Sequence, residues 1–253
     1  MTGKGLCVID AVLFDLADTL VNFHDLKLTT TLKGGACETY KHLQNLAVAL
    51  PEFTRYRNAH LWAFKRRYLW SAMRRRDFTF MDVIIQVLGR FSIDLPIGEY
   101  ETLAWLWYRP FARRAYVDAG VAWALDQLKA LGIKLAVVSN TCVPAHCMDQ
   151  HLQRENLLQY FPIRIYSSMT LYRKPHRRIF DTALQQLNVV PEKAAFVGDR
   201  LQTDIRGARR LGMLTIWKPT IHWTTSMRLH GADHVIRRIA DLPHILTELR
   251  TAG

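Results

Sequence analysis

An aspartate, Asp15, follows a short apolar run near the start of the chain. If that run is a buried strand, Asp15 lies at the carboxyl edge of a sheet, where open α/β folds bind their ligands. A carboxylate in this position can attack phosphorus, provided that a cation offsets the repulsion between the two anions. Asp15 is therefore the first candidate for a catalytic residue.

Two later segments bring further polar groups to the ends of apolar runs. Ser139 and Asn140 follow one run, and the hydroxyl of Ser139 can donate a hydrogen bond to a phosphoryl oxygen. Lys174 follows the next run and precedes Pro175, in a segment that opens a helical pattern. Its positive charge would stabilise the nucleophile and a transferring anionic group.

A fourth segment, residues 196–204, carries two carboxylates. Asp199 ends another apolar run, and Asp204 lies in the helical pattern that follows. Hard oxygen ligands of this kind suit Mg²⁺. The segment therefore predicts a magnesium site.

The elements that must position these residues alternate along the chain. Five short apolar runs are typical of buried parallel strands; they cover residues 8–14, 134–138, 163–166, 194–197 and 214–217. Helical patterns between them cover residues 121–131, 176–187 and 203–211. This alternation predicts an α/β fold with a doubly wound parallel sheet.

The stretch from residue 22 to residue 115 breaks the alternation. It contains helix-compatible segments rich in Arg, Trp, Tyr and Phe, and it has no convincing buried strand. Pro51 and the segment 95–98 are the expected breaks between its helices. We expect an α-helical domain here, inserted into a core made of residues 1–21 and 116–253.

Taken in order, the four polar segments resemble the haloacid dehalogenase superfamily of hydrolases, over residues 1–21 and about 116–253. The resemblance implies a Rossmann-like core with a helical cap at residues 22–115. It also implies a magnesium-dependent phosphatase of small anionic phosphorylated metabolites, acting through an aspartyl-phosphate on Asp15. The roles that it implies are catalysis for Asp15, Ser139 and Lys174, substrate binding for Asn140 and Asp18, and magnesium binding for Asp15, Ala17, Asp199 and Asp204.

Ala17 departs from the family pattern, because the phosphatases of this family usually carry a second Asp there. That Asp protonates the leaving group and later activates water, and such assistance is typically worth ~10²- to 10⁴-fold in rate. The family's metal contact at this position is a backbone carbonyl, which alanine retains. Asp18, in the place usually held by glycine, is the nearest replacement acid, and a substrate such as an acyl phosphate would need none.

Two other activities remain open on this pattern. The phosphonatases of the family also carry alanine at this position and form a Schiff base with a cap lysine, for which Lys41 and Lys65 are candidates. A core that binds phosphate and metal without turnover is the second alternative. The Asp199 and Asp204 pair argues against a metal-independent dehalogenase.

The charge of the chain favours anionic partners, since 34 Lys and Arg against 22 Asp and Glu give a net charge of +12. Basic runs interleaved with aromatic residues would permit nucleic-acid contact; they are 65–67, 74–76 and 113–114. A basic helical surface over an aromatic core is the favoured interpretation. We expect no zinc site at Cys142, His146, Cys147 and His151, whose helical spacing separates them into two pairs.

The apolar stretch at the N-terminus is interrupted by Asp10, so we interpret it as a strand and not as a signal peptide. No run approaches the ~18 uninterrupted apolar residues that a membrane span requires. Four cysteines without a CxxC pair indicate a reducing compartment. We therefore expect a cytoplasmic protein that does not cross a membrane.

Overall fold

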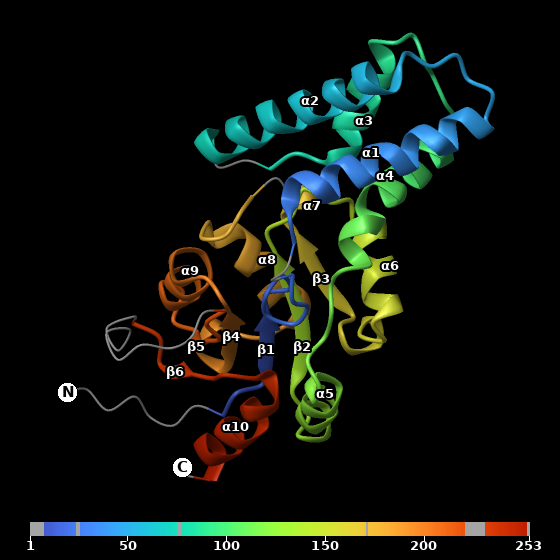
Figure 1. Cartoon of the computed structure of the whole chain (residues 1–253). Helices are drawn as coiled ribbons and strands as arrows, with labels where there is room; N and C mark the ends of the chain where they lie inside the picture. Colours follow the sequence, from blue (N-terminus) through green and yellow to red (C-terminus); the bar gives the residue numbers. More distant parts are fainter. Residues whose placement is uncertain (1–7, 24–25, 75–76, 171, 221–230, 252–253) are drawn as a thin grey trace. The chain divides into compact units, whose positions relative to one another are not determined.

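The computed structural model describes residues 8–23, 26–74, 77–170, 172–220 and 231–251 (Figure 1). Its contacts divide the chain into two compact units. We call them the core unit, made of Met1–Asn22, Tyr116–Asn140 and Gln153–Gly253, and the helical unit, made of Phe23–Ala115 and Thr141–Leu152. The segment Thr141–Leu152, which the sequence assigned to the core, thus belongs to the helical unit.

Six strands of the described chain form one parallel sheet, in the order β3-β2-β1-β4-β5-β6. Their bounds are β1 Ala11–Phe14, β2 Lys134–Ser139, β3 Ile163–Tyr166, β4 Ala194–Gly198, β5 Leu214–Trp217 and β6 His234–Val235. The predicted doubly wound parallel sheet is confirmed, and each of the five expected strands is present. The two-residue β6 was not predicted.

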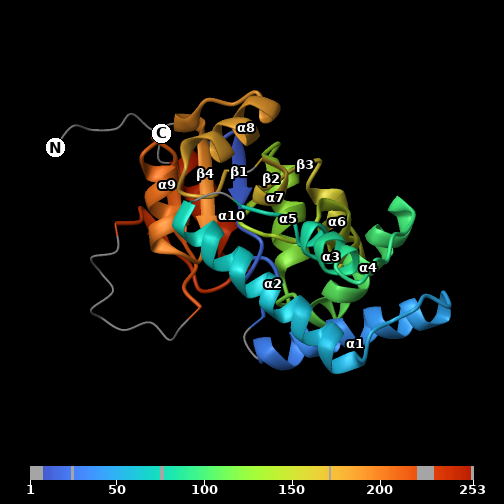
Figure 2. The same cartoon turned by 90° about the horizontal axis from the view of Figure 1, so that it is seen from above.

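Both faces of the central strands are buried, which is why their sequences are continuously apolar. On one face, Leu13 and Phe196 pack with Phe180 of α8 (Arg177–Leu187) and Ala208 of α9 (Arg206–Arg209). Figure 2 shows α8 on one side of the strands, with α5 (Val121–Ala130) and α10 (Leu242–Thr251) on the other. The remaining helices of this part of the chain are α6 (Ala145–Arg154), which crosses the boundary between the units, and α7 (Ser167–Thr170).

The helix expected at residues 203–211 is split. A π-helical turn covers Leu201–Ile205 and α9 only Arg206–Arg209. Short 3-10 turns cover Leu158–Tyr160, Pro191–Lys193 and Ile239–Asp241.

The strand order places the switch point of the sheet between β1 and β4. From β1 the chain proceeds outward through β2 to β3, and it then returns to β4 on the other side of β1. Loops that leave adjacent strands in opposite directions open a crevice at their carboxyl ends. Asp15 directly follows β1 and Asp199 directly follows β4, so both lie at this crevice.

Four helices make up most of the helical unit. They are α1 (Leu28–Asn45), α2 (Phe53–Arg74), α3 (Phe80–Gly89) and α4 (Ile97–Ala112). Pro51 lies between α1 and α2, and Pro96 immediately precedes α4. The start of α3 is fixed by Thr79, whose hydroxyl accepts a hydrogen bond from the Asp82 amide at 3.2 Å, while the Asp82 carboxylate accepts one from the Thr79 amide.

Aromatic rings fill the interior of the helical unit. The ring centroids of Phe80 and Trp107 are 4.3 Å apart, and those of Tyr56 and His60 are 4.5 Å apart. Gly35 lets α1 approach α4, because a Cβ there would lie 2.5 Å from the Trp107 carbonyl oxygen.

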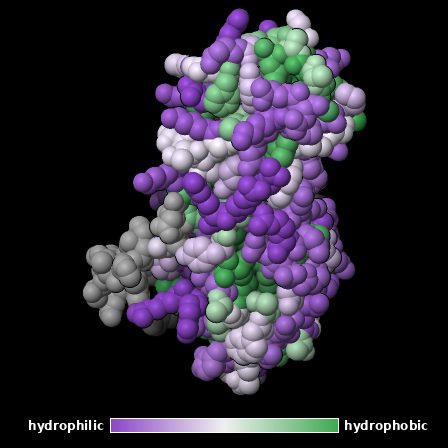
Figure 3. All heavy atoms as spheres, turned by 45° about the vertical axis from the view of Figure 1, so that its right-hand side comes forward, coloured by the Kyte–Doolittle hydropathy of each residue, from purple (hydrophilic) through white to green (hydrophobic). Residues whose placement is uncertain are grey.

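Hydrophilic residues cover most of the face drawn in Figure 3, and apolar residues gather there in small patches. None of the described helices is long and apolar enough to cross a membrane.

Candidate active site

Asp15 and Lys174 form a buried ion pair at the switch point. The Asp15 backbone amide donates a hydrogen bond to the Val197 carbonyl at 2.9 Å, which ties the end of β1 to β4. The Lys174 Nζ lies 2.7 Å from Asp15 Oδ1 and 2.9 Å from Asp204 Oδ1. Asp15 is buried, with a relative solvent exposure of 6%, and Lys174 and Asp204 are also buried. One ammonium group is thus held between two carboxylates.

Asn140 positions Lys174 through its main chain. The Asn140 Nδ2 donates to the Lys174 carbonyl at 3.0 Å, and the Lys174 amide donates to Asn140 Oδ1 at 2.7 Å. Both ends of the Asn140 amide are therefore engaged. Next to it, Ser139 is buried at the end of β2, and its hydroxyl makes no hydrogen bond within the described part of the chain.

Asp204 approaches the sheet closely because Gly198 has no side chain. A Cβ on Gly198 would lie 2.6 Å from the Asp204 Cβ. Asp204 Oδ2 accepts a hydrogen bond from the Arg200 amide at 3.0 Å, and Oδ1 accepts one from the Thr203 hydroxyl at 3.2 Å in addition to Lys174. The oxygens of Asp204 are thus committed to neighbouring groups.

Asp199 differs from Asp204 in having an unengaged oxygen. Its Oδ1 is buried and has no hydrogen-bond partner among the described residues, while Oδ2 lies 3.8 Å from the Arg200 Nε. The Trp217 indole donates to the Asp199 carbonyl at 2.8 Å and holds the main chain in place. A buried carboxylate oxygen without a hydrogen-bond partner is expected of a metal ligand whose ion is absent.

Asp15, Asp199 and Asp204 bring three carboxylate oxygens within 4.8 Å of one another. Burial, followed by the nearby charges of Asp15 and Asp204, raises the pKa of Asp199 to about 8. Burial alone would lower the pKa of Lys174, but Asp15 and Asp204 raise it above its usual value, so Lys174 stays charged. The Lys174 ammonium thus contacts two of the three acidic groups, and the all-oxygen donor set fits a hard divalent cation.

Across the described residues, no other group of three or more His, Cys, Asp and Glu side chains has such geometry. In the run from Cys142 to His151, the Cys147 Sγ lies 3.1 Å from the His146 Nε2, and the His151 Nδ1 pairs with the Tyr108 hydroxyl at 2.8 Å. These side chains make separate contacts.

The turn after Asp15 presents Ala17 and Asp18. Ala17 forms an isolated β-bridge with Val21, and the Asp18 amide donates a hydrogen bond to the Val21 carbonyl at 2.7 Å. Asp18 has a φ of 59°, in the left-handed region that favours glycine. The turn therefore has the backbone shape of a glycine turn, although a carboxylate residue occupies it.

Lys218 is a residue of this site that the sequence did not reveal. It follows β5, is buried, and its Nζ donates to the Asp18 carbonyl at 3.1 Å and lies 3.5 Å from Asn22 Oδ1. Burial lowers the pKa of Lys218, and Asp118, Asp199 and Asp18 oppose that shift. Its signal in the sequence is weak, because a single lysine after a strand usually reaches solvent.

The arrangement has the parts needed for nucleophilic chemistry on an anionic group. A carboxylate nucleophile is held by a charged lysine, an adjacent buried hydroxyl has no partner within the described chain, and a set of carboxylates fits a cation. The site residues expected from the four segments converge on the carboxyl edge of β1, β2 and β4.

Known proteins share this sequence pattern and fold. A family model described as haloacid dehalogenase-like hydrolase matches residues 9–212. The glyceraldehyde 3-phosphate phosphatase of Pyrococcus furiosus is 43% identical over 100 residues, which are 40% of this chain and 41% of that protein. The chain thus matches about two fifths of that relative's length.

Two longer matches agree with the family model. A haloacid dehalogenase-like hydrolase domain-containing protein 3 of Xenopus laevis is 30% identical over 192 residues, which are 73% of this chain and 75% of that one. The crystal structure of a HAD phosphatase from Thermococcus onnurineus superposes with a TM-score of 0.62 and 25% identity, covering 94% of this chain and 98% of that one. The chain therefore belongs to the haloacid dehalogenase-like hydrolases, as its four polar segments predicted.

Proposed function

We propose that this hydrolase is a magnesium-dependent phosphatase of small anionic phosphorylated metabolites, with Asp15 as the nucleophile. The observation that carries the proposal is the buried ion pair of Asp15 and Lys174 at the switch point, beside the orphaned oxygen of Asp199. Phosphatases among the similar proteins support the reaction class.

Asp15, Asp199 and the backbone carbonyl of Ala17 are the groups proposed to hold Mg²⁺. When bound, the ion would offset the negative charge that Asp15 and a phosphoryl group bring together. Asp204, whose oxygens are engaged by Lys174 and the Arg200 amide, is proposed to position Lys174, and its part in metal binding stays a prediction. Asn140 is proposed to have the same positioning role, and the substrate contact expected of it from the sequence stays a prediction.

Two displacements at phosphorus make up the proposed reaction. A carboxylate oxygen of Asp15 attacks phosphorus, the bond to the leaving-group oxygen breaks, and that oxygen keeps the electron pair. Water then attacks the phosphorus of the aspartyl-phosphate, which releases inorganic phosphate and restores the carboxylate. Lys174 and the Ser139 hydroxyl hold the phosphoryl oxygens in both steps.

Ala17 determines which leaving groups the site handles well. Its methyl group cannot deliver a proton, so substrates whose leaving group is stable as an anion, such as acyl phosphates, are proposed to react fastest. For ordinary monoesters, we propose the Asp18 carboxyl, in the same turn as Ala17, as the group that supplies the proton and contacts the substrate.

Phosphate release from a panel of monoesters and acyl phosphates, with and without Mg²⁺, tests the proposal. Asp15→Asn is expected to lower the rate by at least about 10³-fold, because the amide is a poor nucleophile. Asp10→Asn is the matched control, since Asp10 precedes the same strand and pairs with Lys193 at 3.4 Å. Absence of turnover across the panel in protein that binds Mg²⁺ would contradict the proposal.

The phosphonatase alternative has less support. A Schiff-base lysine reacts as a free amine and is usually desolvated, whereas the four lysines of the helical unit, Lys27, Lys33, Lys41 and Lys65, are all exposed. Borohydride trapping of an aldehyde substrate on Lys41 or Lys65 would restore this alternative.

A further inference from the structure

Helix α2 of the helical unit is basic and carries exposed aromatic side chains. Its 22 residues include six Lys and Arg and no Asp or Glu. Trp62 is 70% exposed, Trp70 is 50% exposed, and Leu69 and Met73 are also exposed. An exposed apolar surface of this kind marks an interaction site more often than scattered single residues do.

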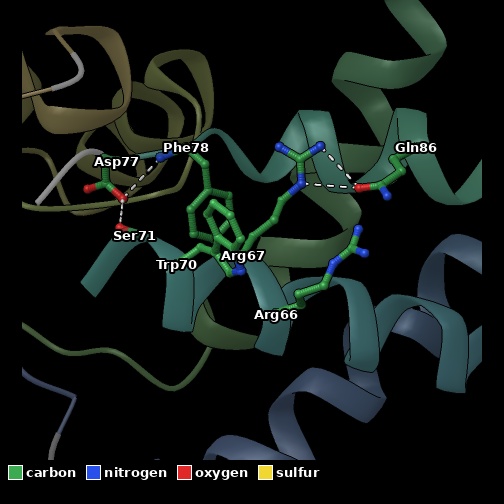
Figure 4. Close-up of a pocket in the computed structure, with 7 residues that line it drawn as sticks. All are labelled: Arg66, Arg67, Trp70, Ser71, Asp77, Phe78 and Gln86. Carbon is green, nitrogen blue, oxygen red and sulfur yellow. Dashed lines mark hydrogen bonds between the residues drawn. The ribbon is translucent and has the colours of Figure 1, made fainter. Parts of the chain in front are cut away.

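The first of two open hollows along this helix has a volume of about 490 Å³ and contains Trp70 (Figure 4). Arg67 donates from Nε and from a terminal nitrogen to Gln86 Oε1, at 3.2 and 3.1 Å. Asp77, at the far end of the hollow in Figure 4, accepts hydrogen bonds from the Ser71 hydroxyl and the Phe78 amide. Arg66 lines the same hollow, and its guanidinium has no hydrogen bond or ion pair within the described chain.

The second hollow has a volume of about 330 Å³ and is lined by three cations and no acid. The cations are Lys65, Arg66 and Arg90, and none of them forms an ion pair with a described residue. The Lys65 Nζ lies 5.6 Å from the centre of the Trp62 ring, which lines the hollow as well. Three unpaired cations around one indole repel each other, and an anion bound there would relieve that repulsion.

Arg66 lines both hollows, with Trp62 on one side of it and Trp70 on the other. The two indoles are eight residues apart on one helix, or roughly 12 Å along its axis. We propose that α2 binds single-stranded nucleic acid, with bases stacked on Trp62 and Trp70 and a connecting phosphate on Arg66. Exposed indoles and unpaired cations are the two features that such sites combine.

Charge and shape favour this ligand over other partners. A second copy of α2 would bring two helices without acidic residues together, and like charges at short distance are unfavourable. A duplex keeps its bases stacked in pairs and offers none to Trp62 or Trp70. An acidic bilayer is the competing partner, and the comparison with phosphatidylserine vesicles below tests it.

Fluorescence anisotropy of labelled 12-nucleotide DNA and RNA strands tests the proposal on the full chain. We expect salt-dependent binding with a Kd of about 1–100 µM. Trp62→Ala should weaken binding about 5- to 150-fold, and Arg66→Gln should reduce the salt slope by about 0.7. The matched controls Trp123→Ala and Arg210→Gln, exposed residues of the core unit, should leave binding unchanged.

Three results would overturn the proposal. The first is that the parent protein does not bind single strands. The second is that Trp62→Ala binds them as tightly as the parent does. The third is that the protein prefers phosphatidylserine vesicles to oligonucleotides. Because the substituted side chains are exposed, thermal unfolding of each variant should match that of the parent. Asp15→Asn should bind the strands normally, so this result is independent of the phosphatase activity.

Discussion

The core unit and the helical unit bury ionisable groups in opposite ways. In the core unit, Lys174 is buried but remains charged, because Asp15 and Asp204 lie within 3 Å of its Nζ. In the helical unit, His60 is fully buried among aromatic rings, and neither ring nitrogen has a hydrogen-bond partner among the described residues. Burial lowers the pKa of His60 to about 3, so the ring is neutral.

The core unit thus keeps paired charges in its buried site, whereas the interior of the helical unit is packed with neutral rings. Buried charges are unfavourable unless they are paired, and a group of them is retained where chemistry requires it. The cations of the helical unit that matter to our second proposal are instead exposed: Lys65 and Arg66 lie on α2, and Arg90 directly follows α3. Four substitutions, each with a control, test this difference between the two units.

Lys174→Met should have the largest effect, because it leaves Asp15 and Asp204 buried without a cation. We expect a loss of about 3–5 kcal/mol in the free energy of unfolding, measured with urea, and a loss of at least about 10²-fold in phosphate release. Lys65→Met in the helical unit should change stability by less than about 0.5 kcal/mol. Similar losses for both variants would remove the distinction between the units.

Ala17→Asp tests whether the core lacks only a proton donor. If so, hydrolysis of monoesters should rise by about 10²- to 10⁴-fold, while hydrolysis of acyl phosphates should change little. Ala17→Asn is the matched control for size and polarity. An unchanged or lower rate with monoesters would show that the site is built for a different leaving group.

His60→Leu should stabilise the helical unit by about 1–3 kcal/mol, because it removes two buried nitrogens without partners. His60 also makes stability depend on pH. The pKa is 6.5 in the unfolded chain and about 3 in the folded one, so the unfolded state binds the proton more tightly and stability falls as the pH drops from 6.5 toward 3.

Urea unfolding at several pH values measures this effect. The free energy of unfolding of His60→Leu should fall less than that of the parent as the pH drops from 6.5 toward 3. His42→Leu provides the control, because His42 is half-buried and its Nε2 lies 2.7 Å from the Glu99 carboxylate. The prediction fails if His60→Leu and the parent lose stability equally on acidification.

Gly198→Ala and Gly98→Ala should have different effects on the free energy of unfolding. A Cβ at Gly198 would meet Asp204 at 2.6 Å, whereas a Cβ at Gly98 meets nothing within 4 Å. We expect the first change to cost about 1–3 kcal/mol and to slow phosphate release, and the second to be neutral or stabilising by up to about 1 kcal/mol. Equal effects would contradict the close approach of Asp204 to β4.

Much of the core could be predicted because its signals are local. Each of the strands β1 to β5 is an apolar run bounded by polar or turn residues, and Asp15, Asn140 and Asp199 directly follow three of them. The two-residue β6 carries too little pattern to be recognised. The π-helical turn at Leu201–Ile205 was not predicted either, because the sequence pattern there fits an ordinary helix.

The remaining features depend on contacts that are distant in sequence. Lys218 meets Asp18 and Asn22 across about 200 residues, so nothing next to Lys218 indicates its burial. The assignment of Thr141–Leu152 to the helical unit follows from contacts such as the hydrogen bond of Tyr108 to His151.

The central claim is that Asp15 attacks phosphorus. A single-turnover reaction with Mg²⁺ and an acyl phosphate, quenched rapidly in acid and followed by peptide mass spectrometry, tests it most directly. We predict a phosphoryl group on the Asp15 carboxylate that appears and decays with phosphate release, and none in Asp15→Asn. Phosphate release at the parental rate by Asp15→Asn, or a phosphoryl group on another residue, would contradict the claim.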